Sequence, residues 1–239
     1  MIRTIAPNPR RANFGRCSAC AVRSLSICGA LDPADLVEFE RIARHVQLTH
    51  NEALFTAGQA ATAVHNMTAG VARLYKLLPD GRRQVIGFAL PGDFLGAMPS
   101  DRYSFSADAI GAVSACRLSA DAFAHFIGQR PHFLLRINEF AAHELMLAQE
   151  QMLVLGRRTA EEKVAAFLVG WSKRLAHIGD EQPTIVLPMS RQDIADYLGL
   201  TIETVSRTLT RFEREKILVI VAGGVRLLDP KRVEAMAAA

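Results

Sequence analysis

The chain lacks any apolar run long enough to cross a membrane as a helix. Its longest apolar runs, such as VIGFALPG and ILVIVAGGV, fall well short of the roughly 18 residues that a membrane-spanning helix needs. The first 30 residues contain five arginines and no acidic residue, but no apolar stretch follows them that would make a signal peptide. We therefore expect a cytoplasmic protein with no membrane partner.

The chain also lacks the common short motifs of enzymes. It contains no G-x-G-x-x-G sequence, no P-loop, no H-E-x-x-H sequence and no G-x-S-x-G sequence. An enzyme or an electron carrier that uses a second cofactor is therefore not supported, and we expect a protein that is not an enzyme.

Cysteine is scarce, but three of the four cysteines lie close together near the N-terminus. They are Cys17, Cys20, Cys28 and the distant Cys116. A chain of this length can bury a core without disulfides, and in a reducing compartment a cysteine cluster more often binds metal or does redox work. Four thiolates suit either a tetrahedral zinc ion or an iron–sulfur cluster, and their spacing does not decide between the two. A zinc knuckle or a metal-free dithiol in the arm, with Cys116 an ordinary buried thiol, also stays open.

Positive charge is concentrated at the two ends of the chain. The net charge is +4, and residues 31–156 contain 10 basic against 13 acidic residues, whereas residues 157–239 contain 13 against 11. A mildly basic C-terminal part permits binding to nucleic acid without requiring it.

The middle of the chain predicts a helix followed by a small sheet. Residues 31–48 have the apolar spacing of an amphipathic helix, with Asp32 placed to cap it and Pro33 at its first position. From about residue 52 to residue 118 the pattern changes to short alternating runs, and LPDGRRQ is typical of a turn between strands. Several short strands at this spacing predict an antiparallel sandwich or roll.

A long helix with two apolar faces is predicted from Pro131 to about Gly156. Phe133, Ile137 and Phe140 form one face, which we expect to pack on the chain's own domain. The other face repeats in steps of four and three residues, as in a coiled-coil seam, and we expect it to form a homodimer interface. This seam consists of Leu134, Asn138, Ala141, Leu145, Ala148, Met152 and Leu155.

The stretch SRQDIADYLGLTIETVSRTLTRFEREKIL predicts a helix-turn-helix. Ser190 and Asp193 form a capping box, Gly199 supplies a left-handed turn, and Thr201 caps the second helix. The predicted inward face of that helix consists of Val205, Leu209 and Phe212. The two apolar runs around Gly223 predict a hairpin that forms a wing.

The outward face of the second helix has residue types that contact bases in the major groove. Arginine can donate two hydrogen bonds to guanine, glutamate accepts one from cytosine, and serine can do either. The candidate base-contacting residues are Glu203, Ser206, Arg207 and Thr210. The candidate phosphate-binding residues are Ser190, Arg191, Thr204 and Arg211, and Thr201 at the cap completes the DNA-binding set.

A roll, a long helix and a winged helix-turn-helix in this order resemble the CRP/FNR family of transcription regulators. The resemblance covers the chain from about Leu31, with its sharpest matches in LPGDFLG, RRTAEEKVAAFL and MSRQDIADYLGLTIETVSRTLTRF. It implies an α+β fold with an N-terminal antiparallel β-roll like cyclic-nucleotide-binding domains, a long dimerisation helix and a C-terminal winged helix-turn-helix. The implied domains are a cluster-binding arm (1–30), the sensor roll (31–130), the dimerisation helix (131–157) and the DNA-binding domain (158–239).

Within that family the chain is most similar to the FNR-type oxygen sensors. Glu203, Ser206 and Arg207 match an E-x-x-S-R pattern, which implies that a homodimer binds an inverted repeat of TTGAT-type half-sites in double-stranded DNA. RNA polymerase is implied as a further partner. FNR proteins hold a [4Fe-4S] cluster with three N-terminal cysteines and one from the roll, which implies Cys17, Cys20, Cys28 and Cys116 as its ligands.

The gap of seven residues before the third cysteine resembles the FnrN/FnrL-like versions, whereas the related FixK proteins often lack the N-terminal set. The resemblance therefore implies a regulator of anaerobic and microaerobic genes that binds DNA when its cluster is intact.

The residues of the roll also bear on which other ligands it could bind. Cyclic-AMP receptors have a glutamate and an Arg-Ser pair after PGDFLG, whereas Ala97 and Phe105-Ser106 stand near those positions here and Arg102 is the only nearby cation. We therefore expect no cyclic nucleotide. The histidines available for haem, a less favoured alternative, are His45, His50 and His65. A regulator of the same fold that senses a small effector, nitric oxide or a redox couple, with zinc on the cysteines, also stays open.

Overall fold

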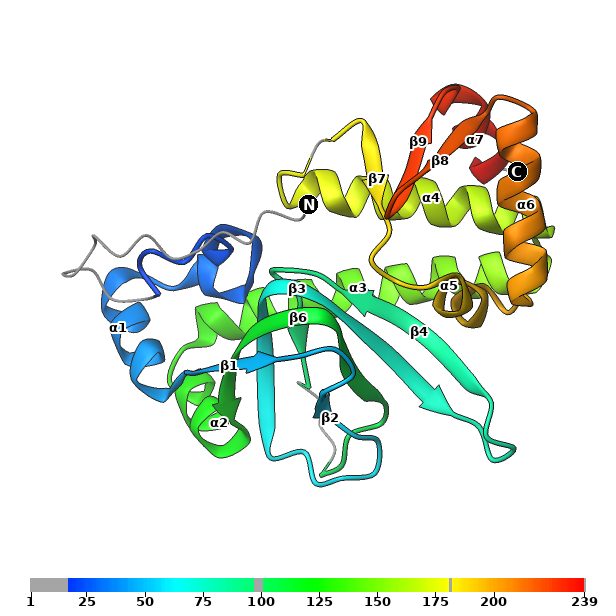
Figure 1. The fold of residues 1–239 in the computed structure, drawn as a ribbon. Coiled ribbons are helices and arrows are strands. Elements are labelled where there is room, and N and C mark those ends of the chain that lie inside the picture. The colour runs from blue at the N-terminus through cyan, green and yellow to red at the C-terminus, as the bar shows by residue number, and fades with distance from the viewer. Residues whose placement is uncertain (1–16, 97–100, 181, 239) are drawn as a thin grey trace. The chain divides into compact units, whose positions relative to one another are not determined.

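A computed structural model describes residues 17–96, 101–180 and 182–238 (Figure 1). The chain folds into two compact units, and each contains two separate stretches of sequence. The first unit extends to Arg73 and resumes from Ala89 to Ala141, and the second contains Leu74–Phe88 and the chain from Ala142 onward. Among the described residues, no helix combines the length and the apolar character needed to span a bilayer.

A six-stranded sheet has the order β1-β6-β3-β4, with β2 paired to β6 and β5 paired to β3. The pairs β1–β6, β2–β6 and β3–β5 are antiparallel, as expected for a roll. The strands are β1 (Arg44–Leu48), β2 (Ala53–Phe55), β3 (Ala63–Leu77), β4 (Arg83–Ala89), β5 (Phe94–Leu95) and β6 (Ser106–Ser119).

The helix predicted over residues 31–48 is shorter in the structure. Helix α1 covers Pro33–Ile42, and the Asp32 carboxylate caps it by accepting a hydrogen bond from the Asp35 backbone N–H at 2.7 Å. Residues Arg44–Leu48 form β1 instead, with His45 opposite Cys116. Continuing the helix beyond Ile42 was wrong, because pairing with β6 satisfies this segment in an extended conformation.

Two strands predicted between residues 103 and 118 form the single strand β6. Gly111 lies inside it with φ of +75°, a conformation that glycine adopts without a steric penalty. Strand β6 therefore continues through Gly111 without ending. The predicted turn at LPDGRRQ is confirmed, since Gly81 has φ of +85° and its N–H donates to the Leu78 carbonyl at 2.9 Å.

The helices of the first unit pack on a core that includes the N-terminal arm. Ile27 of the arm, Phe39 of α1 and Leu118 of β6 are buried in the same apolar cluster. Two short 3-10 helices, η1 (Arg23–Leu25) and η2 (Ile27–Ala30), place Ile27 in this core. The arm is therefore fixed to the roll by burial of apolar surface.

The long helix α3 (Pro131–Arg157) begins in this core, and helix α2 (Ala120–Gly128) precedes it. Phe133 is fully buried, with its ring centroid 5.6 Å from that of Phe126 in a perpendicular, edge-on arrangement. Ile137 and Phe140 pack against the same cluster, which confirms the prediction that this face of the helix packs on its own domain.

The second unit contains the remaining helices and a three-stranded sheet with the order β7-β9-β8. Helix α4 begins at a capping box formed by Thr159 and Glu162. The elements of the second unit are the later part of α3, α4 (Ala160–His177), β7 (Thr184–Val186), α5 (Arg191–Leu198), α6 (Ile202–Arg214), β8 (Leu218–Val221), β9 (Gly224–Leu227) and α7 (Pro230–Ala238). Strands β8 and β9 form the predicted wing, and α7, which was not predicted, packs on α4.

Candidate DNA-binding surface and metal centre

The helix-turn-helix is built by local signals that the sequence shows. Helix α5 starts with a complete capping box, in which Ser190 and Asp193 each bond the other's backbone N–H. It ends at Gly199, whose φ of +61° is left-handed, and the Leu200 N–H then donates to the Ala195 carbonyl at 3.0 Å. These contacts confirm the predicted caps and the predicted turn.

Helix α6 is amphipathic, and its inward face holds it in the unit. Val205, Leu209 and Phe212 are all buried, as predicted, and Thr208 is buried beside them. Thr201 caps the helix by accepting a hydrogen bond from the Thr204 N–H at 3.2 Å. Burial of this stripe fixes which face of α6 points away from the core.

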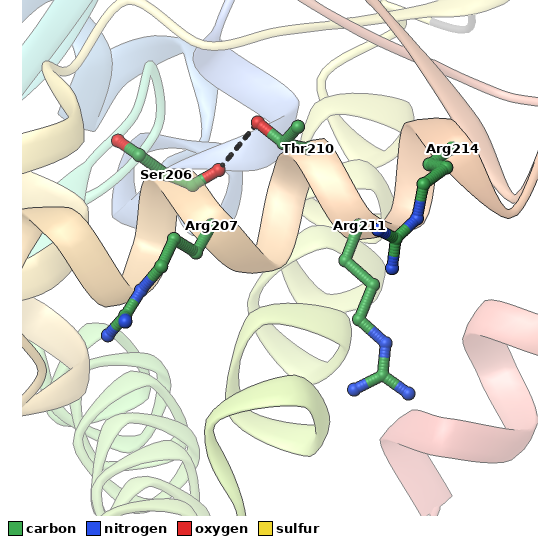
Figure 2. A pocket seen from close by; sticks show the side chains of 5 residues that line it. All are labelled: Ser206, Arg207, Thr210, Arg211 and Arg214. Carbon is green, nitrogen blue, oxygen red and sulfur yellow. Dashed lines mark hydrogen bonds between the residues drawn. The ribbon is translucent and has the colours of Figure 1, made fainter.

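The outward face of α6 presents the predicted base-contacting residues to solvent. Glu203, Arg207 and Thr210 are exposed and Ser206 is half-buried. The Thr210 hydroxyl donates to the Ser206 backbone carbonyl at 3.0 Å (Figure 2). The pKa of Glu203 is lowered by hydrogen bonds from its own backbone N–H and from Thr201, so its carboxylate is ionised at neutral pH and can accept from a base.

A pocket of about 380 Å³ lies on this face, and the arginines among its lining residues can donate hydrogen bonds to phosphates or base edges (Figure 2). It is lined by Ser206, Arg207, Thr210, Arg211 and Arg214. Arg214 was not among the predicted DNA-binding residues. Its position seven residues after Arg207, two helical turns along the same face, is the signal that identifies it.

Two of the predicted phosphate-binding residues already have partners within the chain. The Ser190 hydroxyl donates to the Asp193 carboxylate at 2.7 Å, so its proton is used in the cap. The Arg211 guanidinium pairs with Glu215 at 2.8 Å and also with Glu161. Arg191 and Thr201 are exposed and Thr204 is half-buried. Binding of a phosphate by Ser190 or Arg211 therefore requires an exchange of partners.

The predicted dimer seam on α3 is exposed in the chain. Leu134 is 44% exposed, Leu145 58% and Met152 64%. Ala141, Ala148 and Leu155 are exposed as well. The exposed apolar strip is wider than predicted, because it also includes Leu135, Met146 and Leu153. A strip of this size on one helix is typical of a surface that a partner covers.

The four cysteines come from two parts of the first unit. Cys17 and Cys20 lie in the arm, where the Cys20 N–H donates to the Cys17 carbonyl at 3.4 Å, and Cys28 lies in η2. Cys116 lies on β6, with its sulfur 3.8 Å from Nδ1 of His45. All four are free thiols, and all except the half-buried Cys20 are buried. The fold therefore gathers the predicted ligands from distant parts of the sequence.

The three buried cysteines have raised pKa values, and burial is the main cause. Burial raises the pKa of Cys116 to about 12, with further contributions from Cys17, Cys20 and Cys28. Burial likewise raises the pKa of Cys17 to about 12 and that of Cys28 to about 11. Across the described ranges, no three Cys, His, Asp or Glu side chains are grouped so that they could hold one metal ion. A bound cation would offset the raised pKa values and stabilise the thiolates.

The roll has a buried cation, but a carboxylate pairs with it. Arg73 and Asp108 form a bidentate ion pair at 2.7 and 3.0 Å, with each side chain 9% exposed. Arg102 donates to the Gly58 carbonyl at 2.6 Å, and Ser106 accepts from the Ala57 N–H at 3.0 Å. Ala97, used in the argument against cyclic AMP, lies outside the described residues.

The histidines considered for haem have different surroundings. His65 is buried, and its burial lowers its pKa to about 4. His45 and His50 are exposed, and Nδ1 of His50 accepts from the Gly111 N–H at 3.1 Å. His45 lies in β1, His50 follows that strand, and His65 lies in β3.

Two family profiles match the chain. The profile described as bacterial regulatory proteins of the crp family matches residues 187–218, which include α5 and α6. The profile of the cyclic nucleotide-binding domain matches residues 45–130, which include the strands of the roll.

Curated relatives match nearly the full length. The chain is 64% identical over 225 residues to the transcriptional activatory protein AadR of Rhodopseudomonas palustris, covering 94% of each chain. It is 56% identical over 223 residues to the nitrogen fixation regulation protein FixK of Bradyrhizobium diazoefficiens, covering 93% of this chain and 94% of that one. It is 32% identical over 225 residues to the transcriptional activator protein FnrL of Cereibacter sphaeroides, covering 90% and 91%.

A solved structure has the same arrangement of elements. The structure of FixK2 from Bradyrhizobium japonicum matches with a TM-score of 0.77 and 36% sequence identity, covering 83% of this chain and 98% of that one. Together with the two profiles, it confirms the predicted α+β fold of a roll, long helices and a C-terminal helix-turn-helix.

Proposed function

Because the chain belongs to the Crp/FNR family of DNA-binding transcription regulators, we propose that it controls transcription in response to oxygen through a [4Fe-4S] cluster. The relatives are transcription regulators rather than enzymes. The observation that carries the proposal is the gathering of four free cysteines, three from the arm and one from β6, within range of mutual repulsion. The proposed ligands are Cys17, Cys20, Cys28 and Cys116.

The donor set fits a cluster better than a single zinc ion. Zinc–sulfur bonds of about 2.3 Å place the sulfurs of a tetrahedral site only about 3.8 Å apart. Among the described residues no three such side chains are grouped closely enough for one metal ion, although Cys17, Cys20 and Cys28 each contribute to the raised pKa of Cys116. Four thiolates are also the ligand set of a group that contains four iron atoms.

The residues of the first unit provide a route from the cysteines to the long helix. When bound, the [4Fe-4S] cluster supplies oxygen-sensitive bonds that join the arm to β6. Cys17 and Cys28 belong to the same apolar cluster as Phe133, the fully buried residue in the first turn of α3. Loss of the link between arm and β6 would loosen this core and with it the support of α3.

We propose further that the chain acts as a homodimer through the exposed seam of Leu145, Met152 and their neighbours on α3. Two copies of α6 would then bind half-sites of the TTGAT type, arranged as an inverted repeat with their centres about one helical turn apart. Arg207 and Glu203 would contact the bases, and RNA polymerase would be the next partner. A shift of a few kcal/mol in the monomer–dimer equilibrium is enough to switch such binding.

The proposal is tested by purifying the protein without oxygen and measuring iron, sulfide, zinc and DNA binding before and after exposure to air. We expect four iron and four sulfide per chain, visible absorption that bleaches in air, and DNA binding that is lost with it. Cys116→Ser should lose iron and anaerobic DNA binding, whereas Ser114→Ala on the same strand should keep both. A colourless protein with zinc, or DNA binding that survives in air with the colour lost, contradicts the proposal.

A further inference from the structure

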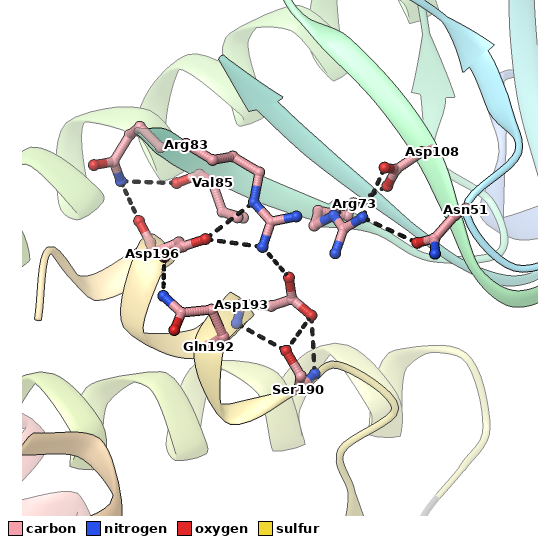
Figure 3. Close-up of polar contacts among 10 residues, drawn as sticks. Asn51, Arg73, Arg83, Val85, Asp108, Ser190, Gln192, Asp193 and Asp196 are labelled. Carbon is pink, nitrogen blue, oxygen red and sulfur yellow. Dashed lines mark hydrogen bonds and ion pairs between the residues drawn. The ribbon is translucent and has the colours of Figure 1, made fainter. Parts of the chain in front are cut away.

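The hairpin formed by the end of β3 and by β4, residues Leu74–Phe88, groups with the helix-turn-helix in the second unit. Arg83 of this hairpin contacts α5 through two carboxylates (Figure 3). Its Nη2 donates to Oδ1 of Asp193 at 2.7 Å and to Oδ2 of Asp196 at 2.9 Å, and its Nε donates to Oδ2 of Asp196 at 3.0 Å. The Gln84 side-chain amide donates to the Asp196 backbone carbonyl at 2.5 Å.

These carboxylates are not free surface charges. The Asp193 side chain is 5% exposed and that of Asp196 is 14% exposed, while Arg83 is 25% exposed. The other oxygen of Asp193 accepts from the backbone N–H and the hydroxyl of Ser190, which form the cap of α5 (Figure 3). Arg83 supplies a positive partner to these two largely buried carboxylates. Arg83 is thereby linked to the first turn of α5.

Apolar contacts hold the hairpin in the same place. The ring of Phe88 lies 6.0 Å from that of Trp171 and 5.6 Å from that of Tyr197. Arg174 of α4 donates to the Phe88 carbonyl at 2.7 Å. The ion pair of Arg83 therefore sits beside a packed aromatic contact, unlike an isolated surface pair, which contributes little.

The contact bears on how the helix-turn-helix meets DNA. In this motif the first helix crosses the DNA backbone, with its N-terminal N–H groups near the phosphates. Without the charge of Arg83, the negative charges of the two carboxylates on α5 would repel those phosphates. We propose that Arg83 is a positioning residue for DNA binding, which fixes the start of α5 and neutralises Asp193 and Asp196. This inference rests on the DNA binding of the proposed function.

The test measures DNA binding of the full-length protein, prepared without oxygen, to a duplex with TTGAT and its inverted copy. Arg83→Asp should weaken binding about tenfold or more, because it places a third negative charge beside two carboxylates. The swap Arg83→Asp with Asp196→Arg should restore binding to within about threefold of wild type. Arg82→Gln is the matched control, since Arg82 pairs with Asp80 within the exposed turn, and it should change binding little.

Restoration by the swap shows that the ion pair itself is required, and the circular dichroism spectrum of Arg83→Asp separates positioning from loss of folding, because a positioning role leaves the variant folded. The isosteric Asp196→Asn removes the ion pair together with one negative charge, so it should weaken binding less than Arg83→Gln, which leaves both carboxylates charged. If the wild-type chain binds the duplex and Arg83→Asp binds it equally well or more tightly, this inference is wrong while the proposed function stands. The inference is also wrong if Arg83→Asp is folded and the double variant does not restore binding. A wild-type chain that does not bind this duplex overturns the proposed operator as well.

Discussion

Phe133→Ala should uncouple the long helix from the core of the first unit. Phe133 has no exposed surface, and its ring lies 6.2 Å from that of Phe39 and 5.6 Å from that of Phe126. Removing a buried phenyl group costs about 3–5 kcal/mol, of which the aromatic contacts account for part. With a urea m-value of about 2 kcal/mol/M, the unfolding midpoint of the first unit should fall by roughly 1.5–2.5 M.

Two probes report the two units separately. Hydrogen exchange at the β6 amides in a urea series follows the first unit, and fluorescence of Trp171, the single tryptophan, follows the second. The neighbouring Leu134→Ala is the matched control, since Leu134 is 44% exposed on the seam. It should leave the β6 midpoint in place and weaken dimerisation in sedimentation experiments. A shift below about 0.5 M for Phe133→Ala would refute the reasoning.

Three further predictions concern DNA binding, pH and charge. Arg207→Ala should weaken binding to a TTGAT duplex about 5–150-fold and relax the preference for guanine, whereas Arg214→Ala should lower the salt dependence by about one counterion and leave the preference unchanged. Burial lowers the pKa of His65 from 6.5 to about 4, so the unfolded chain binds more protons between these values. The stability of the first unit should therefore be complete above about pH 6.5 and lower by roughly 2 kcal/mol at pH 5, and His65→Gln should flatten this profile in urea titrations. Arg73→Met should lower the free energy of unfolding by about 3–5 kcal/mol, because Asp108 is left buried without its partner. The double variant Arg73→Met with Asp108→Leu should recover most of this loss in stability. An unchanged unfolding midpoint in the single variant would contradict the prediction.

Features that depend on a few neighbouring residues could be predicted from the sequence. The caps at Asp32, Thr159 and Ser190 and the turn at Gly199 are such features, because each satisfies backbone groups within three or four residues. Helix α7 has the same kind of signal in Asp229 and Pro230, and the Arg232 N–H donates to the Asp229 carboxylate at 3.1 Å. That helix was therefore predictable, although it was missed.

Features that depend on distant pairing could not be predicted. The segment from His45 to Leu48 has a pattern compatible with either helix or strand, and its partner in β6 decides in favour of a strand. The exposed face of α6 followed from periodicity, but the pairing of Arg211 with Glu161, fifty residues away, did not. Local periodicity shows which side of a helix faces outward, whereas the partners of a long charged side chain are set by tertiary structure.

The division of the chain into interleaved stretches limits how such a regulator can be cut and recombined. The second unit, which contains the helix-turn-helix, includes Leu74–Phe88, and in the sequence this stretch lies between two parts of the first unit. A fragment that starts at Ala142 would lose Arg83 and the ring of Phe88, exposing Trp171 and Tyr197 to water. New sensor and DNA-binding combinations therefore cannot arise by a single crossover near the long helix without also replacing this hairpin. Exchange of the hairpin together with the C-terminal part would preserve the aromatic contact and the ion pairs.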